Sequence, residues 1–531
     1  MRGRGKNNKK WISVQIITLI MAIIVAGCSG NGGTSGGSEG TTDTAGSSSA
    51  GGTKELGLMF HFKSGTLDPS NDLVAVRAGI AETLVRLDEN LEVQPWLATE
   101  WTTDDNQSWE FTIRDGVTFH DGSAVDAAAV KSSLERAVRV NSSLGTALKI
   151  DSMTAEGQKL IINTTEAHPA LVSELINPYA AIISTAAEEE MGTDAFNLAP
   201  VGTGPFKVDS FTPNIQIDMI RNDHYWDGAS PLDKVVFKFN EDGNVRSMAL
   251  QSGEVDVATQ LPAETVQTIE QAENLSVKSI AGLRVHFLLF NQDREGVKDL
   301  KVRQALDLLL DRESIANNIM MGHAVPANGP FNTRLPFGSQ DEINELHVER
   351  AQQLLEEAGY TLQNGQMMKD GKPLTLKVLT YKGRPELPLI AQLLQSEAAK
   401  AGITINIQTV ENVDTTIREN KDWDIVTYSN LSAPRGDGGY FLNSAFMPDG
   451  ALNATDLNMS SLTSVLDQLN ETSDPNERIQ LTQEAVEVIK EEVPHAYAVY
   501  PNIIVGMNDR VTNWEPGAEE YYIITNKMDV K

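Results

Sequence analysis

Histidine and cysteine are the side chains from which a transition-metal site is most readily built, and this sequence spaces them too widely for one. It contains eight histidines and one cysteine in 531 residues. No two histidines stand four residues apart or in an H-E-x-x-H pattern, so their spacing predicts no metal site. His61 and His286 lie in expected strands, where a histidine satisfied by its neighbours is the more common case.

The one match to a catalytic motif is a G-x-S-x-G pattern at residues 36–40. A nucleophile elbow needs a strand before it and a helix after it, and neither is expected in this stretch. No other motif combines a nucleophile, a base and an orienting group, although a triad assembled from distant residues stays open. The sequence therefore predicts a protein that is not an enzyme and that needs no cofactor.

The N-terminus has the order of a bacterial targeting segment: positive, then apolar, then small. Five lysines and arginines precede an apolar stretch at 12–25, which is shorter than a membrane-spanning helix requires. It ends in Val-Ala-Gly-Cys at 25–28, which resembles the lipoprotein box, so residues 1–28 are a predicted signal peptide and Cys28 a predicted lipidation site. Residues 29–53, nearly all Gly, Ser and Thr, are a predicted tether. We therefore expect a lipid-anchored protein on the extracytoplasmic face of the cell membrane.

The charge of the chain narrows its partners. The formal net charge is −30, and loss of the leader removes five positive charges and no negative ones. Such a surface repels nucleic acid and anionic lipid headgroups, so neither is an expected partner of the body. An anionic ligand would need arginines placed locally. The single cysteine excludes an intrachain disulfide framework, and we expect a monomer.

The body from residue 54 onward alternates strands and helices, which predicts an α/β fold. Expected strands lie at 56–62, 109–113, 159–163, 215–220, 234–239, 374–380 and 403–410. Expected helices lie at 124–138, 302–310 running on towards Met321, 348–358, 386–401 and 475–491.

Two apolar runs far apart in the sequence, 284–291 and 498–505, indicate that the domains are discontinuous. If both runs cross between lobes, lobe I comprises 54–281 with 498–531, and lobe II comprises 282–497. The expected ligand site is then a cleft between the lobes.

A series of motifs along the body resembles the bacterial extracellular solute-binding proteins of family 5, which bind dipeptides, oligopeptides and nickel. The motifs are LEVQPWLA at 91–98, FTIRDGVTFHDG at 111–122, GTGPF at 202–206, RNDHYW at 221–226, GEVD at 253–256, VRQAL at 302–306 and RAQQLLEEAG at 350–359. The resemblance implies a two-lobed periplasmic-binding-protein-like fold of type II, with an extra subdomain at about 85–200 and a two-strand hinge. It also implies an ABC permease and ATPase as partners.

Within the family, residues 427–443 look most like the nickel- and metallophore-binding branch. The chain has Gly439 where a nickel binder would place a metal-contacting histidine, and it lacks an arginine after Ile176 that histidine–nickel binders carry. These departures favour recognition of a chelate through its organic shell, namely nickel, cobalt or zinc held by an opine-type metallophore.

Planar guanidinium groups suit the carboxylates of such a chelate. The candidate ligand-binding residues are Arg77, Arg139, Tyr428, Arg435, Tyr440 and Asn443. Surface salt bridging is the alternative for the arginines, and core packing is the alternative for the tyrosines.

Other functions stay open at this point. An oligopeptide- or dipeptide-binding protein of an ABC importer would use backbone pairing and a larger cleft with fewer arginines. A sensor that signals to a membrane partner instead of feeding a transporter is a further possibility.

Overall fold

The computed structural model describes residues 52–448, 450–455 and 457–531. The predicted signal peptide with Cys28, and the predicted tether apart from its last two residues, lie outside the described residues. From Thr53 to Lys531 the chain forms one compact unit.

Twelve strands form one mixed sheet whose two halves share strand β21 (His495–Asn508). Sheet I contains β8 (Phe206–Thr212), β9 (Gln216–Arg221), β10 (Lys234–Phe239), β1 (Glu55–Phe60), β11 (Val257–Ala258) and β12 (Leu275–Ala281). Sheet II contains β19 (Thr404–Val410), β18 (Thr375–Tyr381), β20 (Ile425–Leu431), β13 (Arg284–Phe290) and β14 (Ala324–Pro326). Strand β1 runs parallel to β10 and β11, and β18 runs parallel to β19 and β20.

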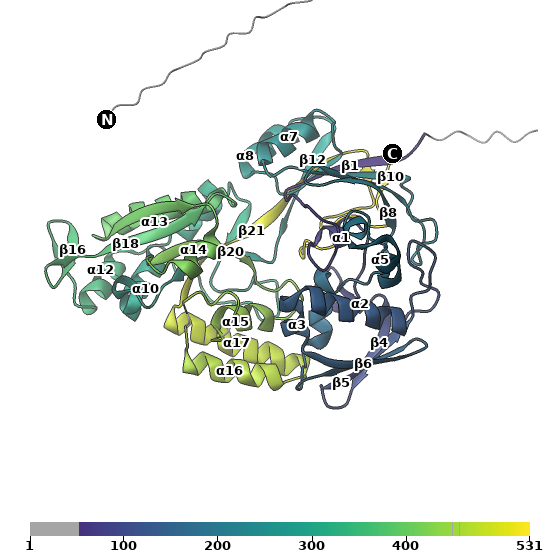
Figure 1. Ribbon diagram of the computed structural model, residues 1–531. Helices are drawn as coiled ribbons and strands as arrows, with labels where there is room; N and C mark the ends of the chain where they lie inside the picture. Colours follow the sequence, from purple (N-terminus) through teal and green to yellow (C-terminus); the bar gives the residue numbers. More distant parts are fainter. Residues whose placement is uncertain (1–51, 449, 456) are drawn as a thin grey trace, which may run out of the picture. The chain divides into compact units, whose positions relative to one another are not determined.

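The chain crosses between the two halves twice. It leaves sheet I after β12 and enters sheet II with β13, and it returns along β21 (Figure 1). The first part of β21 pairs with β13 and β14, and the part from Asn502 onward pairs with β12 and β11. These crossings coincide with the two predicted apolar runs, and the α/β fold class is confirmed. The lobe boundaries stay a prediction, because β21 belongs to both halves and offers no single crossing residue.

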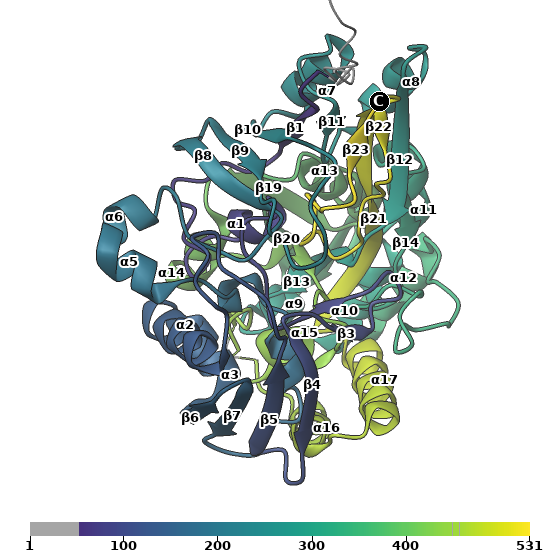
Figure 2. The same cartoon turned by 90° about the vertical axis from the view of Figure 1, so that its right-hand side faces the viewer.

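An insert at 61–205, between β1 and β8, carries its own antiparallel sheet (Figure 2). Its strand order is β4 (Ala98–Thr103), β5 (Ser108–Ile113), β7 (Lys159–Thr164) and β6 (Ile150–Glu156). Helix α2 (Ala127–Val140) covers this sheet and begins at Asp126, whose side chain accepts from the Ala129 N–H. The smaller sheets are β2–β3 (Val85–Leu87, Val93–Pro95), β15–β16–β17 (Thr361–Gln363, Gln366–Lys369, Lys372–Pro373) and β22–β23 (Val511–Thr512, Asp529–Val530).

The remaining helices pack on these sheets. Those of the insert and of sheet I are α1 (Val74–Arg77), α3 (Ser142–Leu148), α4 (Leu171–Glu174), η1 (Pro178–Ala180), α5 (Thr185–Met191), α6 (Thr193–Phe196), α7 (Gly243–Gln251) and α8 (Ala263–Glu270). The others are α9 (Glu295–Lys298), α10 (Leu300–Leu308), α11 (Arg312–Ser314), η2 (Ile315–Ile319), α12 (Val348–Glu357), α13 (Glu386–Lys400), α14 (Val413–Glu419), α15 (Gly439–Phe446), α16 (Ser460–Glu471) and α17 (Pro475–Glu492).

One helix differs from the prediction. The helix expected to run from 302 towards Met321 ends at Leu308, because Asp311 caps a new turn by accepting from the Ser314 N–H at 3.0 Å. Arg312 in that turn is buried and donates to the carbonyl oxygens of Tyr497 and Ala327. These bonds fix the break in the helix.

Apolar side chains fill both faces of sheet II, one face of sheet I, the part of its other face that α7 and α8 cover, and the interior of the insert. Trp423, which precedes β20, is fully buried. In the part of the chain that the structure describes, none of the helices has the length and apolar character needed to cross a membrane.

Candidate functional site

Arg77 ends helix α1 and lies buried in the lobe built on sheet I. Its Nε donates to the carbonyl oxygen of Glu520 at 3.0 Å, and its guanidinium lies 5.2 Å from the ring centroid of Phe60. Burial lowers the pKa of Arg77, and the nearby Glu520 carboxylate only partly opposes this. The Arg77 side chain is therefore a desolvated cation held by one backbone bond.

Two further arginines lie on the sheet II side, where β13 and α13 begin. Arg284 is the first residue of β13, and its one hydrogen bond joins Nη1 to the Ser429 hydroxyl at 3.3 Å. Its Nε is buried and has no partner among the described residues. Burial and then the repulsion of Arg384 lower the pKa of Arg284 to about 10. Binding of an anion would stabilise this guanidinium, because it would supply the missing partner and the opposite charge.

Arg435 lies in the loop between β20 and α15 and joins sheet II to the insert. Its Nη1 donates to Oε2 of Glu174 at the end of α4, and its guanidinium lies 4.4 Å from the ring centroid of Tyr440. Burial raises the pKa of Glu174, against the opposing attraction of Arg435. The Arg435 Nε, like that of Arg284, is buried without a partner in the described chain.

The charges of Arg77 and Arg435 both act on Tyr521 in the C-terminal segment. Burial raises the pKa of Tyr521, and the charges of Arg435 and Arg77 both act on it in the opposite direction. Arg435 comes from the loop after β20 and Arg77 from the insert. The two arginines therefore both lie near one tyrosine, although they are 358 positions apart in the sequence.

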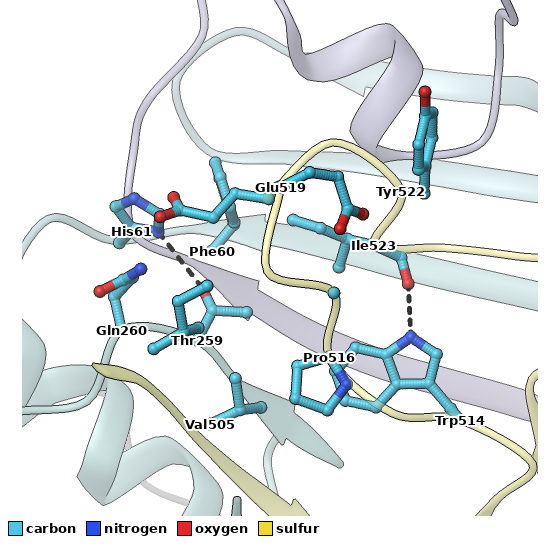
Figure 3. Close-up of a pocket in the computed structure, with 13 residues that line it drawn as sticks. Phe60, His61, Thr259, Gln260, Val505, Trp514, Pro516, Glu519, Tyr522 and Ile523 are labelled. Carbon is cyan, nitrogen blue, oxygen red and sulfur yellow. Dashed lines mark hydrogen bonds between the residues drawn. The ribbon is translucent and has the colours of Figure 1, made fainter. Parts of the chain in front are cut away.

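A cavity of about 30 Å³ adjoins this cluster (Figure 3). Its walls come from β1, the loop after β11, β21 and the C-terminal segment, and they include His61, Gln260, Glu519, Glu520 and Tyr522. A volume of this size holds about two water molecules. The loop after β20 lies against the insert nearby, since a Cβ on Gly436 would come within 2.5 Å of the Leu91 carbonyl oxygen. A larger ligand therefore requires the two lobes to separate.

His61 follows β1 and lines the cavity. Its Nδ1 lies 3.4 Å from the Thr259 hydroxyl, whereas its Nε2 is buried and lacks a partner in the described residues. Burial lowers the pKa of His61 well below its usual value, and the charges of Arg384 and Arg77 lower it further. The imidazole is therefore neutral. His286 is also only partly satisfied, since its Nε2 bonds to Glu386 at 2.7 Å but its Nδ1 is buried without a partner in the described residues. The expectation of a fully satisfied strand histidine thus holds for neither ring.

The other residues predicted from the sequence lie apart from this cluster. Arg139 is exposed near the end of α2, where its charge acts on Glu188. Tyr428 donates its hydroxyl to Asp414 and packs in the core of sheet II. Asn443 exchanges two amide hydrogen bonds with Asn470 of α16, at 2.8 and 2.9 Å. The structure thus brings Arg77, Arg435 and Tyr440 together and engages Tyr428 and Asn443 elsewhere.

Sequence reasoning missed Arg284 and Arg384. Arg284 opens the apolar run identified as a lobe crossing, and a charged residue at the mouth of such a strand is a signal that could have found it. Arg384 precedes Pro385 and helix α13, and no comparable pattern marks it.

A resident metal site is not apparent in these residues. Over 52–448, 450–455 and 457–531, no three His, Cys, Asp or Glu side chains are grouped so as to hold a metal ion. The cluster consists of guanidinium, hydroxyl and neutral imidazole groups. Its chemistry is that of binding an anion, with aromatic rings beside the charges.

Comparison with known proteins finds relatives that are described as nickel-binding. A solved structure described as a nickel ABC transporter from Bacillus halodurans has 45% sequence identity and a TM-score of 0.78, and covers 90% of this chain and 100% of its own. The nickel-binding protein NikA of Staphylococcus aureus is 35% identical over 478 residues, which are 90% of this chain and 94% of NikA. NikA has been solved in complex with Ni(L-His)2, with a TM-score of 0.78 to this chain.

More distant structures share the fold alone. The oligopeptide-binding protein AppA of Bacillus subtilis, solved with a nonapeptide, has 23% identity and a TM-score of 0.74, and covers 90% of this chain and 97% of its own. The family pattern of the bacterial extracellular solute-binding proteins, family 5 middle region, matches residues 92–453. The predicted resemblance is confirmed, and the chain belongs to the bacterial extracellular solute-binding proteins of family 5.

Proposed function

We propose that this protein captures a carboxylate-bearing metal chelate between its two lobes and delivers it to an ABC importer. The observation that carries the proposal is the group of arginines that lies between sheet I, the insert and sheet II. Arg77 and Arg435 act on one tyrosine, and Arg284 and Arg384 act on His61. In a chain with a net charge of −30, such a group is the natural place for an anion.

The pairing of the arginines supports a ligand with more than one carboxylate. Arg435 is neutralised by Glu174, but its Nε stays unpaired. Arg284 has a hydroxyl partner and no carboxylate within hydrogen-bond distance. Two carboxylates, one at each guanidinium group, would satisfy N–H donors that are costly to bury without a partner.

The chelate class follows from the same residues and from the relatives. Bare metal ions need ligating side chains, whereas the arginines suit the organic shell of a chelate. The nickel-binding relatives, one of them solved with Ni(L-His)2, support a nickel chelate with amino-acid character. An opine-type metallophore loaded with nickel, cobalt or zinc belongs to the same class, because it also combines carboxylates with amino groups.

We further propose that the protein is a monomer, held to the outer face of the cell membrane by a lipid on Cys28. The order of charged, apolar and small residues before Cys28 supports this proposal. Mass spectrometry of the membrane fraction checks it. A mature N-terminus that is not an acylated cysteine contradicts it.

Calorimetry tests the ligand. Titrations with Ni(II) alone, with Ni(II) and L-histidine, and with Ni(II) and an opine-type chelator should show weak binding of the bare ion and much tighter binding of at least one chelate. Equal affinity for the bare ion contradicts the proposal. Native mass spectrometry of protein from its own host, showing a retained peptide instead of a chelate, would do so as well.

Arg435→Ala is the matched test of the site, with the exposed Arg139→Ala as its control. We expect Arg435→Ala to weaken chelate binding by at least ~1.5 kcal/mol, the value for a charge-assisted hydrogen bond, and Arg139→Ala to leave it unchanged. Arg435→Ala also leaves the Glu174 carboxylate without its partner. The double variant Arg435→Ala with Glu174→Gln is therefore measured too. If the double variant binds the chelate with wild-type affinity, Arg435 is not part of the ligand site.

A further inference from the structure

Two side chains that line the cavity, His61 and Tyr522, each carry a buried polar atom without a hydrogen-bond partner in the described residues, and the neighbours of His61 indicate which role its free nitrogen has. The His61 ring lines the cavity beside Gln260 and Thr259 (Figure 3), and Nε2 is buried without a partner in the described residues. A buried polar atom normally has a hydrogen-bond partner, so Nε2 is available to bond with a group of the ligand.

The neighbours of His61 favour one of its two neutral tautomers. The Thr259 hydroxyl donates to the Met59 carbonyl oxygen at 3.5 Å, and Nδ1 of His61 lies 3.4 Å from the same hydroxyl. A hydroxyl has one proton, so if it donates to Met59 it must accept from Nδ1–H. Nε2 is then the unprotonated nitrogen, and it can only accept a hydrogen bond.

Arg246 of α7 holds Thr259 in this position. Its Nε donates to the Thr259 carbonyl oxygen at 2.8 Å and its Nη1 donates to the Asn240 carbonyl oxygen at 2.7 Å, while Nη2 donates to that of Gln260. Gln260 has a φ of +49°, a conformation that side chains other than glycine rarely adopt without support. The hydrogen bonds that link Met59, Thr259 and His61 therefore lie in a loop that Arg246 holds in place.

Burial, and then the charges of the surrounding arginines, lower the pKa of His61 and keep the ring neutral. Arg384, Arg77, Arg246 and Arg284 all act on the ring, and none of them donates to Nε2 in the described part of the chain. A second proton on the ring would add a fifth positive charge to this group. The site thus offers cationic donors for carboxylates and one neutral acceptor beside them.

We propose that Nε2 of His61 accepts a hydrogen bond from an N–H group of the bound chelate, so that the site selects chelates combining carboxylates with an N–H donor. The inference rests on the proposed function and narrows its ligand class. It predicts discrimination against chelates whose nitrogens carry no hydrogen, because these leave Nε2 unsatisfied when the lobes close.

Calorimetry with two matched chelator pairs tests this inference. Iminodiacetate and N-methyliminodiacetate, each with Ni(II), differ by one N–H replaced by N–CH3. L-histidine and Nτ-methyl-L-histidine differ in the same way at the imidazole ring. We expect the wild-type protein to prefer the N–H member of at least one pair by tenfold or more, and His61→Leu to reduce that preference below threefold.

Thr259→Val is the second variant, in case His61→Leu does not fold. It removes the hydroxyl that favours the proton on Nδ1, and it should reduce the same preference. If both variants keep the preference for the N–H chelator, the preference arises from steric exclusion of the methyl group, and the inference is overturned. A shift in the visible absorption of the bound nickel that His61→Leu abolishes would show Nε2 ligating the metal, which also overturns it. Failure of the wild-type protein to bind any chelate refutes the proposed function itself.

Discussion

Replacing Arg284 with methionine should stabilise the ligand-free protein and weaken its binding of the ligand. Methionine keeps much of the length of the side chain and removes its charge. Arg284 makes one hydrogen bond, to Ser429, and its Nε is buried without a partner in the described residues. The charge at this position therefore costs folding free energy that only a bound anion can offset.

The magnitude follows from the pKa of Arg284, which burial and Arg384 lower from 12.5 to about 10. At 1.36 kcal/mol for each unit of pKa, the charged form is about 3 kcal/mol less stable in the folded protein than in the unfolded chain. A pKa depressed in this way destabilises the folded state at every pH below about 10, so the effect is fully present at pH 7. Solvent reaches part of this half-buried side chain, so we expect Arg284→Met to raise the free energy of unfolding by about 1–2 kcal/mol.

Arg303 provides the matched control, because it is also a buried arginine without a carboxylate partner. Its guanidinium donates to four carbonyl oxygens, those of Val493, Val297, Lys298 and Glu492. Arg303→Met should therefore lower the free energy of unfolding by about 3 kcal/mol without changing the intrinsic affinity for chelate.

Urea unfolding and calorimetry measure the two quantities. Arg284→Met should weaken chelate binding at least tenfold, the value for one charge-assisted hydrogen bond. If Arg284→Met destabilises the protein as Arg303→Met does and binds the chelate normally, Arg284 has a structural role and the reasoning is refuted.

Three further predictions concern residues outside the arginine cluster. Asn443→Leu should lower the free energy of unfolding by about 1–3 kcal/mol, because it strands the Asn470 amide, and it should leave chelate affinity unchanged in calorimetry. Tyr428→Phe should cost about 1–2 kcal/mol of stability in urea unfolding through loss of the bond to Asp414, and a large drop in affinity would instead place Tyr428 in the site. Burial tends to raise the pKa of Glu386, but the bond from His286 and the charges of His286 and Arg384 together outweigh burial and lower the pKa to about 2. That stability is present above about pH 4.5 and is lost as the pH falls towards 2, so Glu386→Gln should flatten the pH dependence of unfolding between pH 5 and 2.

The elements predicted from the sequence were those with a strong local signal. Strand β10 has the predicted bounds, and α12 and α13 end before Gly359 and Gly402, whose φ values of +90° and +89° other residues rarely adopt. Strand β12 was missed, because its alternation is weak and only its pairing with β21 stabilises it. Pairing between distant segments leaves no pattern within either one.

The site was predicted less completely than the fold for a related reason. Two of the three candidate arginines, Arg77 and Arg435, are buried near Tyr521, and their contact with a ligand stays a prediction. The third candidate, Arg139, lies near the end of α2 and is exposed. The register of α2 instead turns Arg136 inward, where it bonds to Asp68 and Glu188. Helix periodicity alone does not say which of two nearby arginines faces the interior.

Arg284 and Arg435, the two arginines of the cluster whose Nε lacks a partner in the described residues, have different roles in closure. Arg435 already has Glu174 across the contact between sheet II and the insert, so the lobes can approach through this pair when the cleft holds no ligand. Arg284 has no such carboxylate, and its charge stays costly until an anion reaches it. Closure without ligand therefore leaves Arg284 desolvated and unpaired, whereas closure around a carboxylate satisfies it. The free energy that separates an empty closed state from a filled one lies at Arg284, so a transporter that recognises only stably closed protein would depend on that residue more than on Arg435.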